Sequence, residues 1–136
     1  MDFRNLNKIT RKDRHPVNNV FEKLASLKAD TRKSFKYFAS LDLQDAFHNI
    51  EMADEQSKDV TAITTPYGLF RFLHLPFGLS SAPNVFSNMI NLLLEKIQKI
   101  DPQLAPQILV YFDDGLICAQ NWRKFLQVLR LFLMAL

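Results

Sequence analysis

Residues 108–119 read Ile-Leu-Val-Tyr-Phe-Asp-Asp-Gly-Leu-Ile-Cys-Ala, two short apolar runs on either side of a pair of adjacent carboxylates. Apolar runs separated by turn-forming residues predict a β-hairpin with the acidic pair at its tip. A second apolar run, residues 38–43, carries Asp42 near its end, 71 residues before Asp113. If the strand over 38–43 pairs with the hairpin, Asp42 lies beside Asp113. We therefore expect an antiparallel sheet with carboxylates gathered at one end.

The rest of the chain alternates between helical and extended patterns. Apolar residues at a spacing of three and four predict an amphipathic helix over 82–99, with serines before it and a proline in its first turn. The same spacing predicts helices over 17–29 and from Trp122 onward. Extended segments are expected at 60–65 and 69–75, on either side of a Tyr-Gly turn. This order favours an α+β fold in which helices pack on one face of an antiparallel sheet.

The composition is typical of one compact globular domain, with 136 residues of which 48% are hydrophobic and 23% charged. The single cysteine, Cys118, excludes an intrachain disulfide framework. No run approaches the roughly 18 apolar residues of a membrane span, and the basic N-terminal stretch lacks the apolar core of a secretory signal. We therefore expect a soluble, intracellular protein.

Charge is unevenly distributed along the chain. Residues 1–40 hold ten Lys and Arg against four Asp and Glu, whereas residues 41–136 hold seven against ten. The basic first part is suited to phosphates and the acidic second part to cations. A solvated charged face is the alternative interpretation of the basic part.

The carboxylates have two interpretations. Two carboxylates within about 5 Å repel by roughly 1 kcal/mol in water and several times more at a protein-like dielectric, so a bound divalent cation would relieve them. Ligand sets made only of oxygen favour Mg²⁺, and two such ions about 4 Å apart can activate an attacking hydroxyl and stabilise a leaving pyrophosphate. Alternatively, Asp114-Gly115 is simply a two-residue hairpin turn, for which Asp-Gly is a preferred sequence.

Five stretches of sequence, taken in their order along the chain, help to decide between a metal site and a simple hairpin turn. They read DFRNLNK at 2–8, SLDLQDAFHNI at 40–50, YGLFRF at 67–72, LPFGLSSAPNVF at 75–86 and YFDD at 111–114. The last four resemble the ordered motifs of reverse transcriptases, most closely those of gypsy-type LTR retrotransposons. The first resembles a segment that these enzymes carry in their fingers.

The resemblance covers residues 2 to about 120 and implies a right-handed polymerase fold. The resemblance implies that residues 1–136 form a single partial reverse transcriptase domain. Its parts would be a finger-derived basic segment and helix at 1–37, the palm at 38–120 and a truncated helix at 121–136. The implied function is that of an RNA-directed DNA polymerase, which adds deoxynucleotides from deoxynucleoside triphosphates to the 3′-hydroxyl of a primer on an RNA or DNA template. The implied cofactor is a pair of Mg²⁺ ions, with Mn²⁺ as an alternative.

The resemblance also implies roles for individual residues. Asp42, Asp113 and Asp114 match the catalytic carboxylates, which are also metal ligands, and the carbonyl of Leu43 matches a further metal ligand. The basic side chains of the N-terminal stretch are candidate contacts to template phosphates, with a solvated surface as the alternative: Arg4, Lys8, Arg11, Lys12 and Arg14.

Four residues are implied to contact the nucleotide. Phe47 matches the aromatic residue that blocks a ribose 2′-hydroxyl. Phe77 and Gly78 match positions that contact the incoming nucleotide and the template, although core packing is the alternative for Phe77. Tyr111 opens the motif that carries the catalytic pair. The pattern departs from the family at Ser87, where family members usually have glutamine, and a template contact is not expected there.

A function of a different class remains open. The chain would then be a catalytically inactive retroelement remnant that acts at most as a nucleic-acid or protein binding module. Family members carry more of the fingers before this region and a thumb after it. We therefore expect that the 136-residue chain alone does not polymerise.

Overall fold

The computed structural model describes residues 2–11, 21–22, 24–25 and 34–136. The chain forms two compact units, one made of residues 1–15 and 45–86 and the other of residues 16–44 and 87–136. Within the described residues, no helix is both long enough and apolar enough to cross a membrane.

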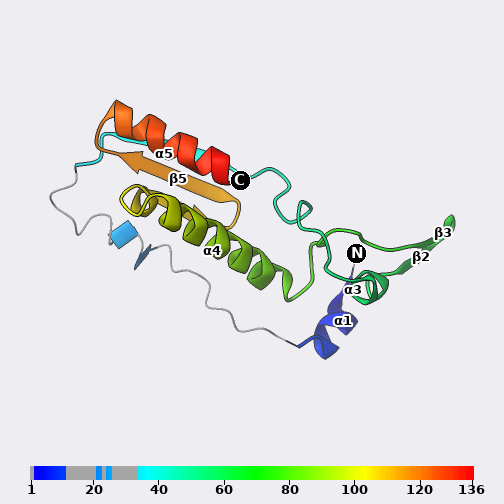
Figure 1. The fold of residues 1–136 in the computed structure, drawn as a ribbon. Coiled ribbons are helices and arrows are strands. Elements are labelled where there is room, and N and C mark those ends of the chain that lie inside the picture. The colour runs from blue at the N-terminus through cyan, green and yellow to red at the C-terminus, as the bar shows by residue number, and fades with distance from the viewer. Residues whose placement is uncertain (1, 12–20, 23, 26–33) are drawn as a thin grey trace. The chain divides into compact units, whose positions relative to one another are not determined.

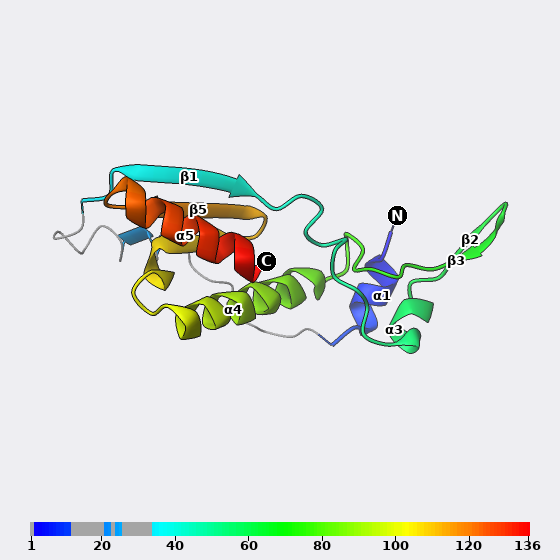
Figure 2. The same ribbon diagram turned by 45° about the horizontal axis from the view of Figure 1, so that its top comes forward.

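The second unit contains a three-stranded antiparallel sheet (Figure 1). Its strands are β1 (Tyr37–Asp42), β4 (Ile108–Tyr111) and β5 (Asp114–Ala119), in the spatial order β1-β5-β4. β1 and β5 run side by side along their whole length, from the pair Tyr37 and Ala119 to the pair Asp42 and Asp114 (Figure 2). The predicted pairing of the 38–43 strand with the 108–119 hairpin is confirmed.

Helix α5 (Trp122–Ala135) covers one face of this sheet. It begins where the Asn121 side chain accepts a hydrogen bond from the Lys124 N–H at 2.9 Å, so an N-cap satisfies one of the free amides of the first turn. Its buried side chains, Phe125, Val128 and Phe132, recur at helical spacing. The helix predicted from Trp122 is therefore confirmed.

Helix α4 (Ala82–Ile100) confirms the predicted helix over 82–99 to within one residue. Phe86, Ile90 and Ile97 are buried at three-four spacing along it. Of the helix predicted over 17–29, residues 21, 22, 24 and 25 are described and are helical. The rest of that prediction lies outside the described residues.

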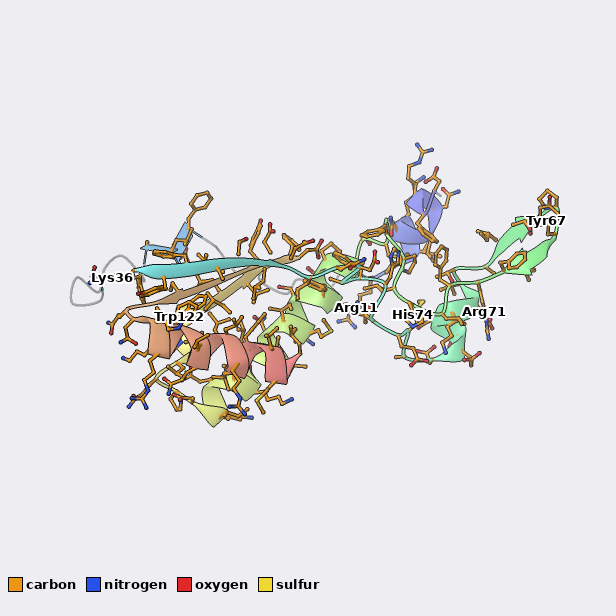
Figure 3. All side chains as sticks on the ribbon, turned by 90° about the horizontal axis from the view of Figure 1, so that it is seen from above. Arg11, Lys36, Tyr67, Arg71, His74 and Trp122 are labelled. Atoms are coloured by element: carbon orange, nitrogen blue, oxygen red, sulfur yellow. The ribbon has the colours of Figure 1, made fainter. Side chains whose placement is uncertain are left out.

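The first unit holds two short helices, α1 (Arg4–Ile9) and α3 (Glu55–Asp59), and the hairpin of β2 (Ile63–Thr65) and β3 (Gly68–Phe70). Its core consists of buried apolar residues bordered by the half-buried Leu6, Phe47, Ile50 and Phe72. The buried members are Phe3, Leu75, Leu79 and Ala82. Figure 3 shows Tyr67 at the tip of the hairpin, with 91% of its surface exposed.

The strands predicted at 60–65 and 69–75 are shorter than expected. Val60 and Thr61 instead complete the turn that ends α3, because their N–H groups donate to the carbonyls of Gln56 and Lys58. Beyond β3 the chain no longer pairs with β2; instead, the Leu75 N–H donates to the Ile50 carbonyl at 2.8 Å. Both departures follow from hydrogen-bond partners that a pattern of apolar residues does not reveal.

Candidate active site

The tip of the β4–β5 hairpin is formed by Phe112 and Asp113. Tyr111 pairs directly with Asp114, so these two intervening residues make the turn. Asp114 and Gly115 belong to β5, and the alternative that Asp-Gly forms the hairpin turn is wrong. Phe112 has a φ of 50°, a left-handed conformation that is uncommon for residues other than glycine.

The backbone brings the three aspartates of the predicted site to one end of the sheet. Asp42 lies opposite Asp114 in the register, and the Leu43 N–H donates to the Asp113 carbonyl at 2.8 Å. The direct neighbour of Asp42 across the strands is thus Asp114, whereas the sequence placed it beside Asp113. Residues directly opposite in an antiparallel pair share a face, so Asp42, Asp114 and Tyr111 share one face of the sheet.

Their side chains differ in exposure. Asp42 and Asp114 are exposed, so two like charges face each other across neighbouring strands, an arrangement that is destabilising. Asp113 is half-buried, and its Oδ1 is buried with no hydrogen-bond partner among the described residues. A buried acceptor without a partner costs on the order of 1–3 kcal/mol.

A divalent cation near Asp42 and Asp114 would offset their like charges, and a cation that reached Oδ1 of Asp113 would give that oxygen a partner. However, the side chains of Asp42, Asp113 and Asp114 do not form the predicted carboxylate cluster. Across the described ranges there is no group of three or more His, Cys, Asp or Glu side chains arranged to hold a metal ion. The register thus brings the three aspartates to one end of the sheet, while their carboxylates are not gathered around one point.

Two of the predicted nucleotide contacts lie together in the first unit. The ring centroids of Phe47 and Phe77 are 5.4 Å apart, and His48 meets Phe77 edge-on at 4.7 Å. Phe77 is 59% exposed, so core packing does not account for it. Phe47 is half-buried, and it stacks on the fully buried Phe86 at 4.9 Å.

Gly78 follows in a loop that requires glycine. Its φ is 95°, a backbone conformation that residues with a side chain rarely adopt, whereas the space beside it would admit a Cβ, 3.5 Å from Cδ2 of Phe3. The Asn7 side chain spans this loop: its Nδ2 donates to the Gly78 carbonyl, and its Oδ1 accepts from the Ser80 N–H. The sequence did not single out Asn7, although a polar residue inside the quoted DFRNLNK stretch was a usable signal.

The remaining predicted contacts are Tyr111, in the second unit, and the basic residues of the N-terminal stretch, in the first. Tyr111 is 41% exposed, and its ring meets Phe112 at 4.7 Å. Arg4 forms an ion pair with Asp2 at 2.6 Å, which raises the pKa of Arg4 and lowers that of Asp2. Lys8 and Arg11 are exposed, while residues 12 and 14 lie outside the described ranges.

Comparison with known proteins gives consistent matches. A family model described as reverse transcriptase (RNA-dependent DNA polymerase) matches residues 1–136. The Pol polyproteins of transposons 297 and gypsy, both from Drosophila melanogaster, are 37% and 36% identical over 96% and 89% of the chain. The chain spans only 11% and 10% of their lengths.

The fold is also that of a solved structure. The crystal structure of the prototype foamy virus protease-reverse transcriptase matches 98% of this chain with a TM-score of 0.74, at 23% identity and over 16% of its own length. The α+β polymerase palm architecture expected from the sequence is therefore confirmed.

Proposed function

This chain belongs to the reverse transcriptase family, and on that premise we propose that it is the palm and part of the fingers of an RNA-directed DNA polymerase from a retroelement. The observation that carries the proposal is the strand pairing that brings Asp42, Asp113 and Asp114 to one end of the sheet. Because the chain spans about a tenth of its transposon relatives, the activity, the template and primer, and the deoxynucleoside triphosphates are all part of the proposal.

In this proposal the three aspartates and the Leu43 carbonyl hold two Mg²⁺ or Mn²⁺ ions. When bound, such ions would lower the pKa of the primer 3′-hydroxyl and neutralise the charge on the departing pyrophosphate. Asp42 and Asp114 contribute facing negative charges from paired strands. Asp113 contributes an oxygen that has no other partner in the described chain, and this supports a role as a ligand.

The nucleotide is proposed to meet aromatic surfaces and backbone. Phe47, held by its stack on Phe86, is proposed to exclude a ribose 2′-hydroxyl. The exposed Phe77 ring and the Gly78 backbone are proposed to contact the incoming nucleotide and the template, and Tyr111 to line the site on the sheet. The division into finger-derived residues 1–37, palm 38–120 and helix 121–136 remains a prediction.

Primer extension tests the proposal. The 136-residue chain is compared with a version extended through complete fingers and thumb, called here the extended polymerase, on an RNA template with Mg²⁺. We expect activity only in the extended polymerase, because held geometry of primer, template and triphosphate can account for roughly 7 to 11 kcal/mol of a barrier. Asp113→Asn should abolish extension, and Glu95→Gln, which removes an exposed carboxylate from α4, should leave it unchanged.

Three outcomes would contradict these expectations. Efficient extension by the 136-residue chain would contradict the expectation that this chain is inactive without the added fingers and thumb, although not its assignment as a polymerase. Activity in the Asp113→Asn extended polymerase would remove this carboxylate from the chemistry. An inactive extended polymerase that still binds a primer–template would favour the binding-module alternative.

A further inference from the structure

Asn7 ties α1 to the loop at 77–80 through both ends of its side-chain amide. Its Nδ2 donates to the Gly78 carbonyl at 2.8 Å, and its Oδ1 accepts from the Ser80 N–H at 2.8 Å. One partner is an acceptor and the other a donor, so the two bonds fix which way the amide points. These contacts join residues more than 70 positions apart in the chain.

The loop that Asn7 holds is anchored at Leu79, whose side chain is buried in the core and whose carbonyl accepts from the Ala82 N–H at 3.1 Å. Residues 77–80 belong to no helix or strand, and Gly78 adopts a φ of 95°. Backbone groups outside regular structure need partners from side chains or water. Asn7 supplies one for the carbonyl of Gly78 and one for the N–H of Ser80, so it substitutes for a missing strand partner.

Phe3 supports the same loop from beneath. Its ring is buried in the core of the first unit, and its Cδ2 lies 3.5 Å from where a Cβ of Gly78 would be. Phe3 therefore packs close to Gly78, while the Asn7 amide bonds to the Gly78 carbonyl and the Ser80 N–H. In the same loop, Phe77 is exposed and its ring contacts Phe47 and His48.

We propose that Asn7 is a positioning residue, which fixes the 77–80 loop so that the Phe77 ring and the Gly78 backbone are presented to an incoming deoxynucleoside triphosphate. The inference rests on the proposed polymerase function, because only that function gives the loop a ligand. Asn7 acts through the loop and does not itself contact the nucleotide.

The first arm of the test uses the 136-residue chain and measures amide hydrogen exchange at Ser80. Asn7→Leu keeps the side-chain size but removes both hydrogen bonds, and it should speed Ser80 exchange about tenfold or more. Asn7→Asp keeps the acceptor for Ser80 but loses the donor to Gly78, so Ser80 should stay protected. Asn5→Leu, an exposed position on the same helix, is the matched control and should change nothing.

The second arm measures kinetics in the extended polymerase. Asn7→Leu should raise the KM for the triphosphate about tenfold with kcat changed less than twofold, because the ligand meets a loop that must first be ordered. Asn7→Asp should give an intermediate KM. A residue that only stabilised the fold would lower the amount of active enzyme and leave KM unchanged.

The outcomes separate this inference from the function on which it rests. If the wild-type extended polymerase is inactive, the proposed function is wrong, and there is then no reason to expect a triphosphate at the 77–80 loop. An active wild type whose Asn7→Leu variant keeps its KM overturns the positioning role alone, as does unaltered Ser80 exchange in that variant. Faster Ser80 exchange together with a raised KM, both absent from Asn5→Leu, supports it.

Discussion

At the tip of the β4–β5 hairpin, Phe112 holds a conformation that costs an L-residue on the order of 1–2 kcal/mol. The strand pairing next to it is fixed by Asp114, which pairs with Tyr111 of β4 and with Asp42 of β1. The neighbouring Asp113 has a buried oxygen without a described partner. Two-residue hairpin turns require a positive φ at their first residue, so of these two features only the unsatisfied acceptor is one that a bound cation would explain.

Divalent cations should stabilise the chain through this site. An ion that binds only the folded state adds about 2.7 kcal/mol at 100 times its dissociation constant. Thermal melts with and without Mg²⁺ or Mn²⁺ should show a higher melting temperature for the wild type and a smaller shift for Asp113→Asn. Glu95→Gln serves as the control for loss of one carboxylate, and equal shifts in all three proteins would count against the site.

Replacement of Phe47 should have two separable effects. Phe47→Val removes the stack on Phe86, so we expect the free energy of unfolding to fall by roughly 1–3 kcal/mol. If Phe47 also excludes ribose, the variant should raise the ratio of kcat/KM for ribonucleotides over deoxyribonucleotides in the extended polymerase. Lower stability with an unchanged ratio would assign Phe47 to the core alone.

Among the elements, those that bury a continuous apolar stripe were predictable from the sequence and the short capped ones were not. The spacing of Phe86, Ile90 and Ile97 predicted α4 to within a residue, because burial of that stripe decides the helix. Helix α3 has no buried residue and depends on the Asp54 cap, with its side chain accepting from Ser57 N–H at 2.7 Å. Of the two partners of Glu55, Lys58 lies three residues away, whereas Arg71 lies 16 residues away and no local pattern reveals it.

The same contrast applies to the candidate site. The apolar runs predicted that the strand carrying Asp42 pairs with the acidic hairpin. The preference of hairpin turns for Asp-Gly, however, would place the turn at Asp114-Gly115, two residues beyond its position in the structure. The turn falls at Phe112-Asp113 because Asp114 is paired on both sides. Side-chain hydrogen bonds across 70 residues, such as that of Asn7 with Gly78, follow from the tertiary fold and not from periodicity.

Helix α5 should depend measurably on its N-cap. Asn121→Ala leaves the Lys124 N–H without its partner and should lower the free energy of unfolding by about 1 kcal/mol. Asn121→Asp keeps an acceptor and adds a negative charge at the helix N-terminus, so it should be at least as stable as the wild type. Urea denaturation measures both, and an equal loss in the two variants would mean that the cap bond is not what stabilises this end.

Helix α3 should loosen in acid. Hydrogen bonds from Lys58 and Arg71 hold the pKa of Glu55 below its ordinary value of 4.5. A carboxylate with a lowered pKa in the folded state stabilises fully above about pH 4.5 and loses that contribution as the pH falls through the lowered value. Exchange of the Val60 amide, which donates to Gln56, should therefore speed up from pH 5 to 3 beyond its intrinsic pH dependence.

A matched variant isolates the contribution of Glu55 to this change. Glu55→Gln should exchange faster at pH 5 and show less of the acid effect. If the wild type and Glu55→Gln have the same pH profile, the ion pairs with Lys58 and Arg71 do not stabilise the helix.

At the scale of the whole molecule, the exposed apolar residues of α5 predict self-association. Leu126 and Leu133 lie seven residues apart, on one stripe, and are 46% and 57% exposed. Contiguous exposed apolar surface promotes association. Sedimentation should show concentration-dependent oligomers that Leu133→Glu reduces and that Gln127→Glu, with the same change in charge, does not. Equal behaviour of the two variants would place the association elsewhere.

The strand order β1-β5-β4 also bears on how this chain tolerates changes of length. β5 is hydrogen-bonded along both edges, and Asp42 faces Asp114 only because β1 keeps its register. Deleting one residue within β1 would turn the later side chains to the opposite face and move Asp42 away from Asp114, whereas a deletion in an exposed connection leaves every pair intact. Within β1, substitutions that preserve the packing should therefore be tolerated, whereas insertions and deletions should not, because they change the pairing of Asp42 with Asp114.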